Sequence, residues 1–267
     1  MPVACWPVRL LLPPSEGKTP GGRGRPLGTR LASEPGDPRT QPRLQIVDAL
    51  EHLLAGPRDV AAAALLLPPA AVDEALAANG RVLTSGTVPA LRRYAGVVYD
   101  GLDAPNLSPG AARAAARSVL VFSGLLGVVR GNEPVPYYRV PAKAVLPGIG
   151  VVGTFWRPVL DDVLPSLLDK QLVVDLRSSD YAAMWRPDRE LARRVVTVRV
   201  LSPLPDGSLG VVSYPSKFAK GRLAAALLEK STAGLEIRTA EDVAAVWRET
   251  TGLPADVQGA QVRIHTA

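Results

Sequence analysis

The chain has 267 residues, of which 47% are hydrophobic and 21% charged, and its formal net charge at pH 7 is +6. This length and apolar content can bury a large core, which excludes a disordered tail protein. Cysteine occurs once, at Cys5, and histidine twice, at His52 and His265. These counts exclude an internal disulfide, a zinc site and a histidine-based triad, so we expect neither a metal nor a cofactor.

Apolar runs in the sequence are short and interrupted. None approaches the roughly 20 residues of a membrane span, and the first apolar residues are broken by Pro7 and Arg9. We therefore expect a cytoplasmic protein without a signal peptide and without membrane contact.

The first predicted element is a strand at residues 8–12. A stretch rich in Pro, Gly and Arg follows at residues 13–42 and predicts a long loop. Residues 43–79 predict helices, the last of which ends at Asn79 and Gly80. Further along the chain, the sequence predicts a helix with Ser108 as N-cap and Pro109 as first residue, strands at 118–123 and 171–176, a helix at 154–169, a hairpin over 194–213, a helix at about 216–230, and a last helix capped by Thr239 and Asp242.

Helices and strands alternate irregularly and no internal repeat occurs. This order favours a mixed α/β (α+β) fold, with a central mixed sheet and surrounding helices. We expect a single compact domain over residues 1–267. The alternative is a division into two domains near residue 110.

The segment LLPPSEGKT (11–19) ends like a nucleotide-binding P-loop. A P-loop needs an early glycine so that backbone N–H groups can surround the phosphates. Here Leu12 stands at that position, and Pro13 and Pro14 each lack an N–H donor. The segment therefore predicts a stiff turn after a strand, with Lys18 at its end, rather than a P-loop.

Several short motifs follow in a fixed order. They are Ser15 with Lys18; VVYDGL (97–102); SGLLG (123–127) followed by Arg130, Tyr138 and Arg139; Phe155-Trp156; DLRSSDY (175–181); and KFAKG (217–221). Together they resemble the peroxide stress protein YaaA family over residues 8 to about 250. Departures from the family pattern include Asp175, Asp180, Phe218 and Lys220 at positions where the family has Asn, Glu, Lys and Arg.

The resemblance implies a compact domain with a positively charged cleft. It also implies DNA binding that is attributed partly to a helix-hairpin-helix element, and a part in limiting peroxide damage by keeping free iron low. No enzymatic reaction is implied.

Candidate binding residues are the cations and hydroxyls of these motifs. For an anion or DNA site they are Ser15, Lys18, Arg130, Tyr138, Arg139, Lys217 and Lys220, with Trp156, Ser178 and Asp180 as secondary candidates. We expect Lys18, Arg130, Arg139, Lys217 and Lys220 to converge on one cleft. A structural pairing of the arginines with nearby carboxylates and a core position for Phe155 and Trp156 are the competing interpretations.

Carboxylates in the same motifs keep a second function open, because they repel phosphate. An enzyme that binds a nucleotide, a nucleobase or another anionic metabolite could use Lys18, Lys217, Asp175 and Tyr181 for amine or acid–base chemistry. The partner is accordingly either duplex DNA, bound without sequence preference, or a small anionic ligand. We expect a monomer.

Overall fold

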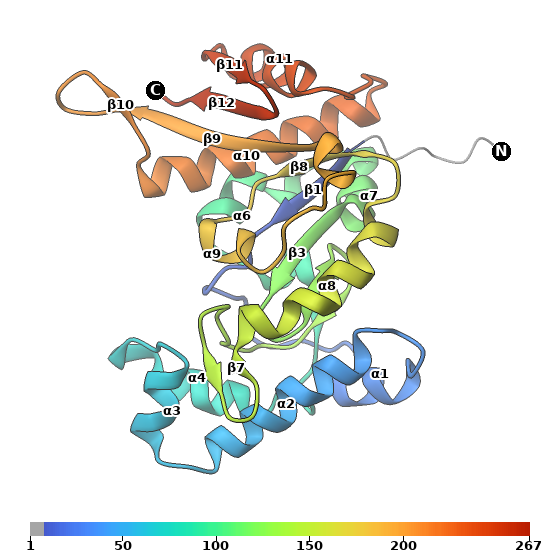
Figure 1. Cartoon of the computed structure of the whole chain (residues 1–267), viewed down its shortest axis with the longest axis vertical. Coiled ribbons are helices and arrows are strands. Elements are labelled where there is room, and N and C mark those ends of the chain that lie inside the picture. The colour runs from blue at the N-terminus through green and yellow to red at the C-terminus, as the bar shows by residue number, and fades with distance from the viewer. Residues whose placement is uncertain (1–7) are drawn as a thin grey trace.

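The computed structural model describes residues 8–267, and within them an eight-stranded mixed sheet forms the centre of the molecule (Figure 1). The strand order is β11-β12-β9-β8-β1-β3-β4, and β10 extends β9. The strands of this sheet are β1 (Val8–Leu12), β3 (Val119–Ser123), β4 (Gly127–Arg130), β8 (Leu172–Asp175), β9 (Val195–Pro203), β10 (Leu209–Gly210), β11 (Ala255–Gln258) and β12 (Gln261–His265).

Eleven α-helices are described between these strands, with two small two-stranded sheets and three short 3₁₀ turns. The helices are α1 (Leu27–Ser33), α2 (Thr40–Leu54), α3 (Arg58–Ala64), α4 (Val72–Asn79), α5 (Ala90–Arg93), α6 (Val97–Leu102), α7 (Pro109–Ser118), α8 (Val152–Leu168), α9 (Ser179–Ala182), α10 (Ser213–Thr232) and α11 (Ala240–Thr251). The 3₁₀ turns are η1 (Pro69–Ala71), η2 (Ala104–Asn106) and η3 (Leu191–Arg194), and the small sheets pair β2 (Val88–Pro89) with β5 (Pro134–Val135) and β6 (Val145–Leu146) with β7 (Gly150–Val151).

Strand β1 lies at the middle of the sheet because its residues are apolar except Arg9, whose guanidinium donates to the carbonyl of Arg117. All five of its residues are buried, and it pairs in parallel with β3 on one side and β8 on the other. Parallel strands buried on both faces need helices on both sides. Their carboxyl ends meet at one edge, where α/β sheets carry their ligand sites.

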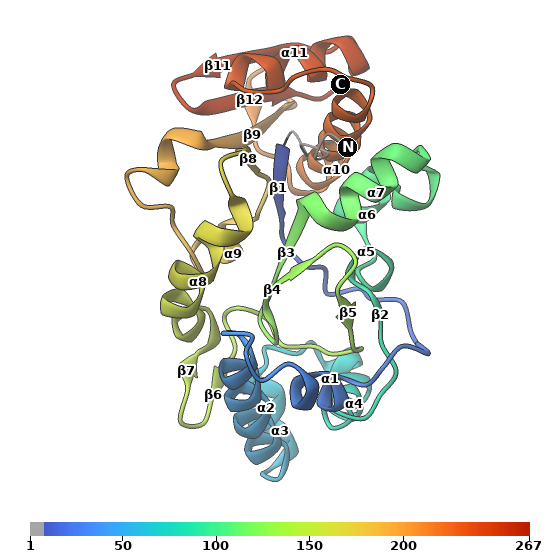
Figure 2. The same cartoon turned by 90° about the vertical axis from the view of Figure 1, so that its right-hand side faces the viewer.

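Helices cover both faces of the sheet, as the two views show together (Figures 1 and 2). Helices α8 and α9 lie on one side, and α6, α7 and α10 lie on the other. Helices α1 to α4 gather at one end of the long axis, and α11 with the β11–β12 hairpin forms the opposite end. The carboxyl end of β1 therefore leads toward the α1–α4 end.

Two motif glycines allow α6 and α10 to cross in close contact. A Cβ on Gly221 would lie 2.0 Å from the carbonyl oxygen of Val98, and one on Gly101 would lie 2.3 Å from that of Phe218. Real Cβ atoms do not approach so closely, so both positions need glycine. The glycines of VVYDGL and KFAKG thus serve helix packing.

A buried ion cluster joins the α1–α2 segment to the strands. The Glu133 carboxylate accepts from Arg30 at 3.1 Å, Arg39 at 3.2 Å and Arg43 at 2.9 Å. Burial opposes ionisation of Glu133, but the three guanidinium groups outweigh it and hold the pKa of the carboxyl below its usual value. Removing the Glu133 carboxylate would break three ion pairs at once and leave the enclosed guanidinium groups poorly compensated.

The mixed α/β fold is as predicted, and most predicted elements are confirmed. The Ser108 cap and the Thr239–Asp242 capping box both form. One prediction was wrong: residues 13–42 are not all loop, because α1 lies within them and α2 begins at Thr40. Helix α1 is held by the burial of Leu27 and Leu31 and by the ion cluster, contacts that local periodicity does not reveal.

The C-terminal strands were not predicted. β11 and β12 form a hairpin, and β12 adds in parallel to β9. The predicted 194–213 hairpin is present as β9 and β10, but its second strand is only two residues long. Helix α10 begins at Ser213, the residue at which the sequence predicted the end of the hairpin's second strand.

One set of contacting buried side chains runs from β1 to β12 through the described residues. Among these residues no single helix is long and apolar enough to cross a membrane. One bent helix pair, Arg58–Ala64 with Pro69–Asn79, could do so by length and composition only.

Candidate functional site

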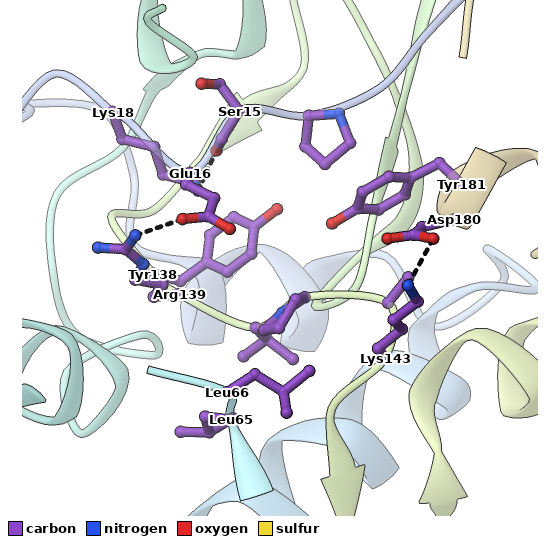
Figure 3. A pocket seen from close by; sticks show the side chains of 14 residues that line it. Ser15, Glu16, Lys18, Leu65, Leu66, Tyr138, Arg139, Lys143, Asp180 and Tyr181 are labelled. Carbon is purple, nitrogen blue, oxygen red and sulfur yellow. Dashed lines mark hydrogen bonds and ion pairs between the residues drawn. The ribbon is translucent and has the colours of Figure 1, made fainter. Parts of the chain in front are cut away.

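A pocket of about 170 Å³ lies beyond the carboxyl ends of the parallel strands. Four segments line it: the turn after β1, the corner after α3, the chain from 138 to 143, and α9. Figure 3 shows Lys18, Glu16, Tyr138 and Arg139 on one wall, with Tyr181, Asp180 and Lys143 on the facing wall. Leu65 and Leu66 close a further side. The site thus combines distant parts of the chain.

The turn at residues 13–19 is held by hydrogen bonds to α6 and to the segment before it. Tyr99 donates its hydroxyl to the carbonyl of Pro13 at 2.8 Å, Ala95 donates its N–H to Gly17 at 3.0 Å, and Thr19 donates to Arg93 at 2.8 Å. These bonds and the two prolines fix the direction in which Lys18 points. The geometry agrees with a stiff turn and not with a P-loop cradle.

The ammonium of Lys18 lies in an enclosed, largely aromatic environment. It donates to the carbonyl of Ser15 at 2.6 Å and lies 4.5 Å from the ring centre of Tyr138 and 5.4 Å from that of Tyr94. Burial lowers the pKa of Lys18 to about 7, and the nearby Arg139 adds to the effect, while Glu16 opposes it. The amine is therefore partly neutral at physiological pH.

Behind Lys18, buried hydroxyls form a short chain. The Tyr138 hydroxyl lies 2.8 Å from that of Tyr94 and 2.6 Å from that of Ser123, and the N–H of Leu126 donates to Ser123 at 3.0 Å. Burial raises the pKa of Tyr138 and Tyr94, so both phenols stay neutral. The chain fixes the ring of Tyr138 against the lysine.

Two exposed ion pairs stand on opposite walls of the pocket. Arg139 donates to Glu16 at 2.5 Å, and Lys143 lies 2.8 Å from Asp180. The carboxylate side chains are 75% and 43% exposed. Exposed pairs of this kind contribute little to stability, so an incoming anion can replace either carboxylate at low cost.

A second charged cluster lies beside the pocket but does not line it. Asp175 accepts from Arg177 at both oxygens, at 2.9 and 2.7 Å, and Lys220 donates to the carbonyl of Arg177 at 2.9 Å. Arg177 also donates to the backbone of Tyr181 at 3.1 Å. This cluster fixes α9, and through it Tyr181, against the sheet.

The expected convergence of five cations was only partly correct. Lys18 and Arg139 line the pocket, whereas Arg130 does not. Arg130 lies beside Leu120, toward the opposite end of the parallel strands, and donates to the carbonyl of Arg117 at the end of α7. The side chain of Lys220 turns to Arg177, and Lys217 is exposed on α10.

The remaining predicted residues divide between pocket and core. Ser15, Tyr138, Asp180 and Tyr181 line the pocket. Trp156 is fully buried and donates its indole N–H to Gly124 at 2.8 Å, so it belongs to the core and cannot stack on a base. Ser178 is the residue before α9, and its hydroxyl does not cap that helix.

Sequence reasoning did not identify Glu16 and Lys143 as pocket residues. Glu16 lies in the LLPPSEGKT turn next to Ser15, so its position in the sequence could have indicated a pocket residue. Lys143 was one of only six lysines in an arginine-rich chain, which was the only available hint. No group of three or more His, Cys, Asp or Glu side chains placed to hold a metal ion occurs within residues 8–267.

The fold and the pocket define a mixed α/β protein with a small charged pocket at the carboxyl ends of its parallel strands. Comparison with known proteins gives the family. The family model described as peroxide stress protein YaaA matches residues 8–247, and the chain belongs to that family.

Three bacterial relatives share most of their length with this chain. A UPF0246 protein of Streptomyces coelicolor is 45% identical over 224 residues, which are 84% of each chain. A UPF0246 protein of Corynebacterium efficiens is 37% identical over 247 residues, covering 90% of this chain and 91% of the relative. One from Corynebacterium glutamicum strain R is 38% identical over 241 residues, 89% and 90% of the two chains.

Proposed function

We propose that this member of the peroxide stress family acts in the cytoplasm by binding a small anionic metabolite in the pocket around Lys18. The observation that carries the proposal is the arrangement of Arg139 and Lys143, which stand on facing walls and are each paired only with an exposed carboxylate. Charge-assisted hydrogen bonds from such cations suit a carboxylate or phosphate group. In this proposal, the protein would limit iron-dependent damage through its binding of the metabolite.

The size and charge of the pocket favour a small ligand over a duplex. Its volume is about 170 Å³, and its basic side chains Lys18, Arg139 and Lys143 are accompanied by two carboxylates, Glu16 and Asp180. Leu65, Leu66 and Pro14 supply apolar contacts. These features fit a molecule of a few heavy atoms that carries one anionic group.

Arg139 and Arg130 offer a matched pair of variants for the test. Small carboxylates and inorganic phosphate would be titrated by calorimetry at two salt concentrations. Arg139→Gln should weaken binding by about 1–3 kcal/mol, the scale of a lost charge-assisted hydrogen bond. Arg130→Gln, outside the pocket, should leave it unchanged. Equal effects of the two substitutions would refute the site.

Glu16 provides a second test with the opposite sign. Its carboxylate is ion-paired with the Arg139 guanidinium in the free protein, so it competes with an incoming anion for that guanidinium. Glu16→Gln should therefore tighten anion binding severalfold. Weaker binding in this variant would mean that Glu16 itself contacts the ligand.

Sequence-independent DNA binding is a second candidate, and one observation favours it. A separate groove of about 520 Å³ is lined by four cations, Lys170, Arg193, Arg194 and Arg238, and by a single carboxylate, Glu236. With the net charge of +6, this surface suits a phosphate backbone. The helix-hairpin-helix element implied by the family resemblance would add further backbone contacts.

Salt dependence separates the two candidates. DNA affinity should fall steeply as salt rises, with a log–log slope set by the number of phosphates contacted. Arg193→Glu should lower DNA affinity without changing small-anion binding. A DNA affinity that responds to Arg139→Gln but not to Arg193→Glu would place the nucleic acid at the pocket instead.

A further inference from the structure

The amine of Lys18 is arranged differently from the other cations of the pocket. Arg139 and Lys143 each have a carboxylate partner, whereas Lys18 has a carbonyl oxygen and two aromatic rings around it. Within the described residues it forms no ion pair. The carbonyl and the rings favour the ammonium, but its burial without a paired carboxylate still makes the charge costly.

The protonation state follows from this environment. With a pKa lowered to about 7 by burial, roughly half of the Lys18 amines are neutral at pH 7. An ordinary lysine has a pKa near 10.4, so fewer than about one in a thousand are neutral at that pH. Desolvated lysines of this type act as nucleophiles toward carbonyl groups.

We propose that Lys18 is a nucleophile that condenses with a small aldehyde or ketone bearing a carboxylate or phosphate. This inference rests on the proposed function, because Arg139 and Lys143 would hold the anionic group while the carbonyl carbon faces the amine. The amine nitrogen forms a bond to the carbonyl carbon, and the carbon–oxygen bond then breaks. The oxygen leaves as water with two hydrogens from the amine, and an imine remains.

The rest of the pocket suits this reaction. Pro14 and the fully buried Leu65 give the site an apolar border that suits the carbon atoms of the substrate. The Tyr181 side chain lies on the wall facing Lys18 (Figure 3), and burial keeps its pKa high. Its neutral hydroxyl can donate a hydrogen bond to the carbonyl oxygen, which polarises the carbonyl group.

Reductive trapping tests the proposal directly. The full-length protein would be incubated near pH 7 with glyoxylate, a small aldehyde with a carboxylate, and cyanoborohydride, and adducts on the six lysines would be mapped by peptide mass spectrometry. Lys18 should be modified at least about tenfold faster than the other five, given its neutral fraction. Uniform labelling of all six lysines would overturn the proposal.

Matched variants and ligands complete the experiment. Lys18→Met should remove the dominant adduct, and Lys230→Met, which changes a lysine outside the pocket, should leave Lys18 as the fastest site. Glyoxylate should label Lys18 faster than acetaldehyde does, because acetaldehyde lacks the anionic group. Equal rates for the two aldehydes would overturn the part of the proposal that specifies an anion.

Glycolate, which has the carboxylate but no carbonyl, separates this inference from the proposed function. If glycolate binds and protects Lys18 from labelling, both proposals are supported. If glycolate binds but Lys18 is not trapped by glyoxylate, the anion site stands and the nucleophile is refuted. If glycolate does not bind and labelling is uniform, both are refuted.

Discussion

Replacing Lys18 by methionine should change how stability depends on pH. The methionine side chain has a similar length and no charge, so it preserves packing while removing the titrating group. In the folded protein the pKa of Lys18 is about 7, whereas in the unfolded chain it is near 10.4. Between these values the unfolded chain binds more protons, so the stability of the wild-type protein should rise with pH in this window.

The expected magnitude follows from the two pKa values. Each pH unit in the window contributes about 1.4 kcal/mol, which gives about 3 kcal/mol between roughly pH 7 and 9.5. Tyr94 and Tyr138 have raised pKa values in the folded state, so their effect begins only near pH 10, when tyrosines of the unfolded chain ionise.

Urea denaturation at a series of pH values measures the effect. The free energy of unfolding of wild type minus that of Lys18→Met should increase by about 3 kcal/mol across the window. Lys143→Met is the control, because that side chain is 64% exposed, and its curve should run parallel to the wild type. If the Lys18→Met and wild-type curves also run parallel, the amine is solvated and the argument for its neutrality fails.

Three further predictions concern packing, charge and capping. Gly221→Ala should cost at least about 2 kcal/mol in urea denaturation, because its Cβ would meet the Val98 carbonyl at 2.0 Å, whereas Gly36→Ala, with open space around it, should change little. Glu133→Gln should cost about 3 kcal/mol at pH 7. Its ionised form stabilises the fold above the unfolded-state pKa, so the difference from wild type should shrink as the pH falls below about 4. Thr239→Ala should lower the melting temperature through a loss of about 1 kcal/mol. An unchanged melting temperature would mean that the capping box contributes nothing.

The sheet and its caps could be predicted because their signals are local. The apolar run of β1, the Ser108-Pro109 helix start and the Thr239–Asp242 box each act within a few residues. Helix α1 could not be predicted, since it depends on Arg30 reaching Glu133 more than 100 residues away. The β11–β12 hairpin gave too weak an alternation of apolar residues to be recognised.

Part of the candidate site could be predicted, because some of its residues stand together in short local motifs. The quoted turn supplied Ser15 and Lys18, and the YR pair supplied Tyr138 and Arg139, all of which line the pocket. Which cations would meet depends on strand order, which the motifs do not encode. Arg130 follows the antiparallel strand β4 away from the site, and no local feature distinguishes it from Arg139.

Strand β1 is made long before its partners. Leu10 pairs with Val119 and Val8 pairs with Leu172, so more than 100 residues must be synthesised before either edge of β1 can be covered. Such distant pairings fold slowly and leave apolar strands open to aggregation. During synthesis, the segment that carries Lys18 therefore follows an apolar strand that stays uncovered until β3 and β8 have been made.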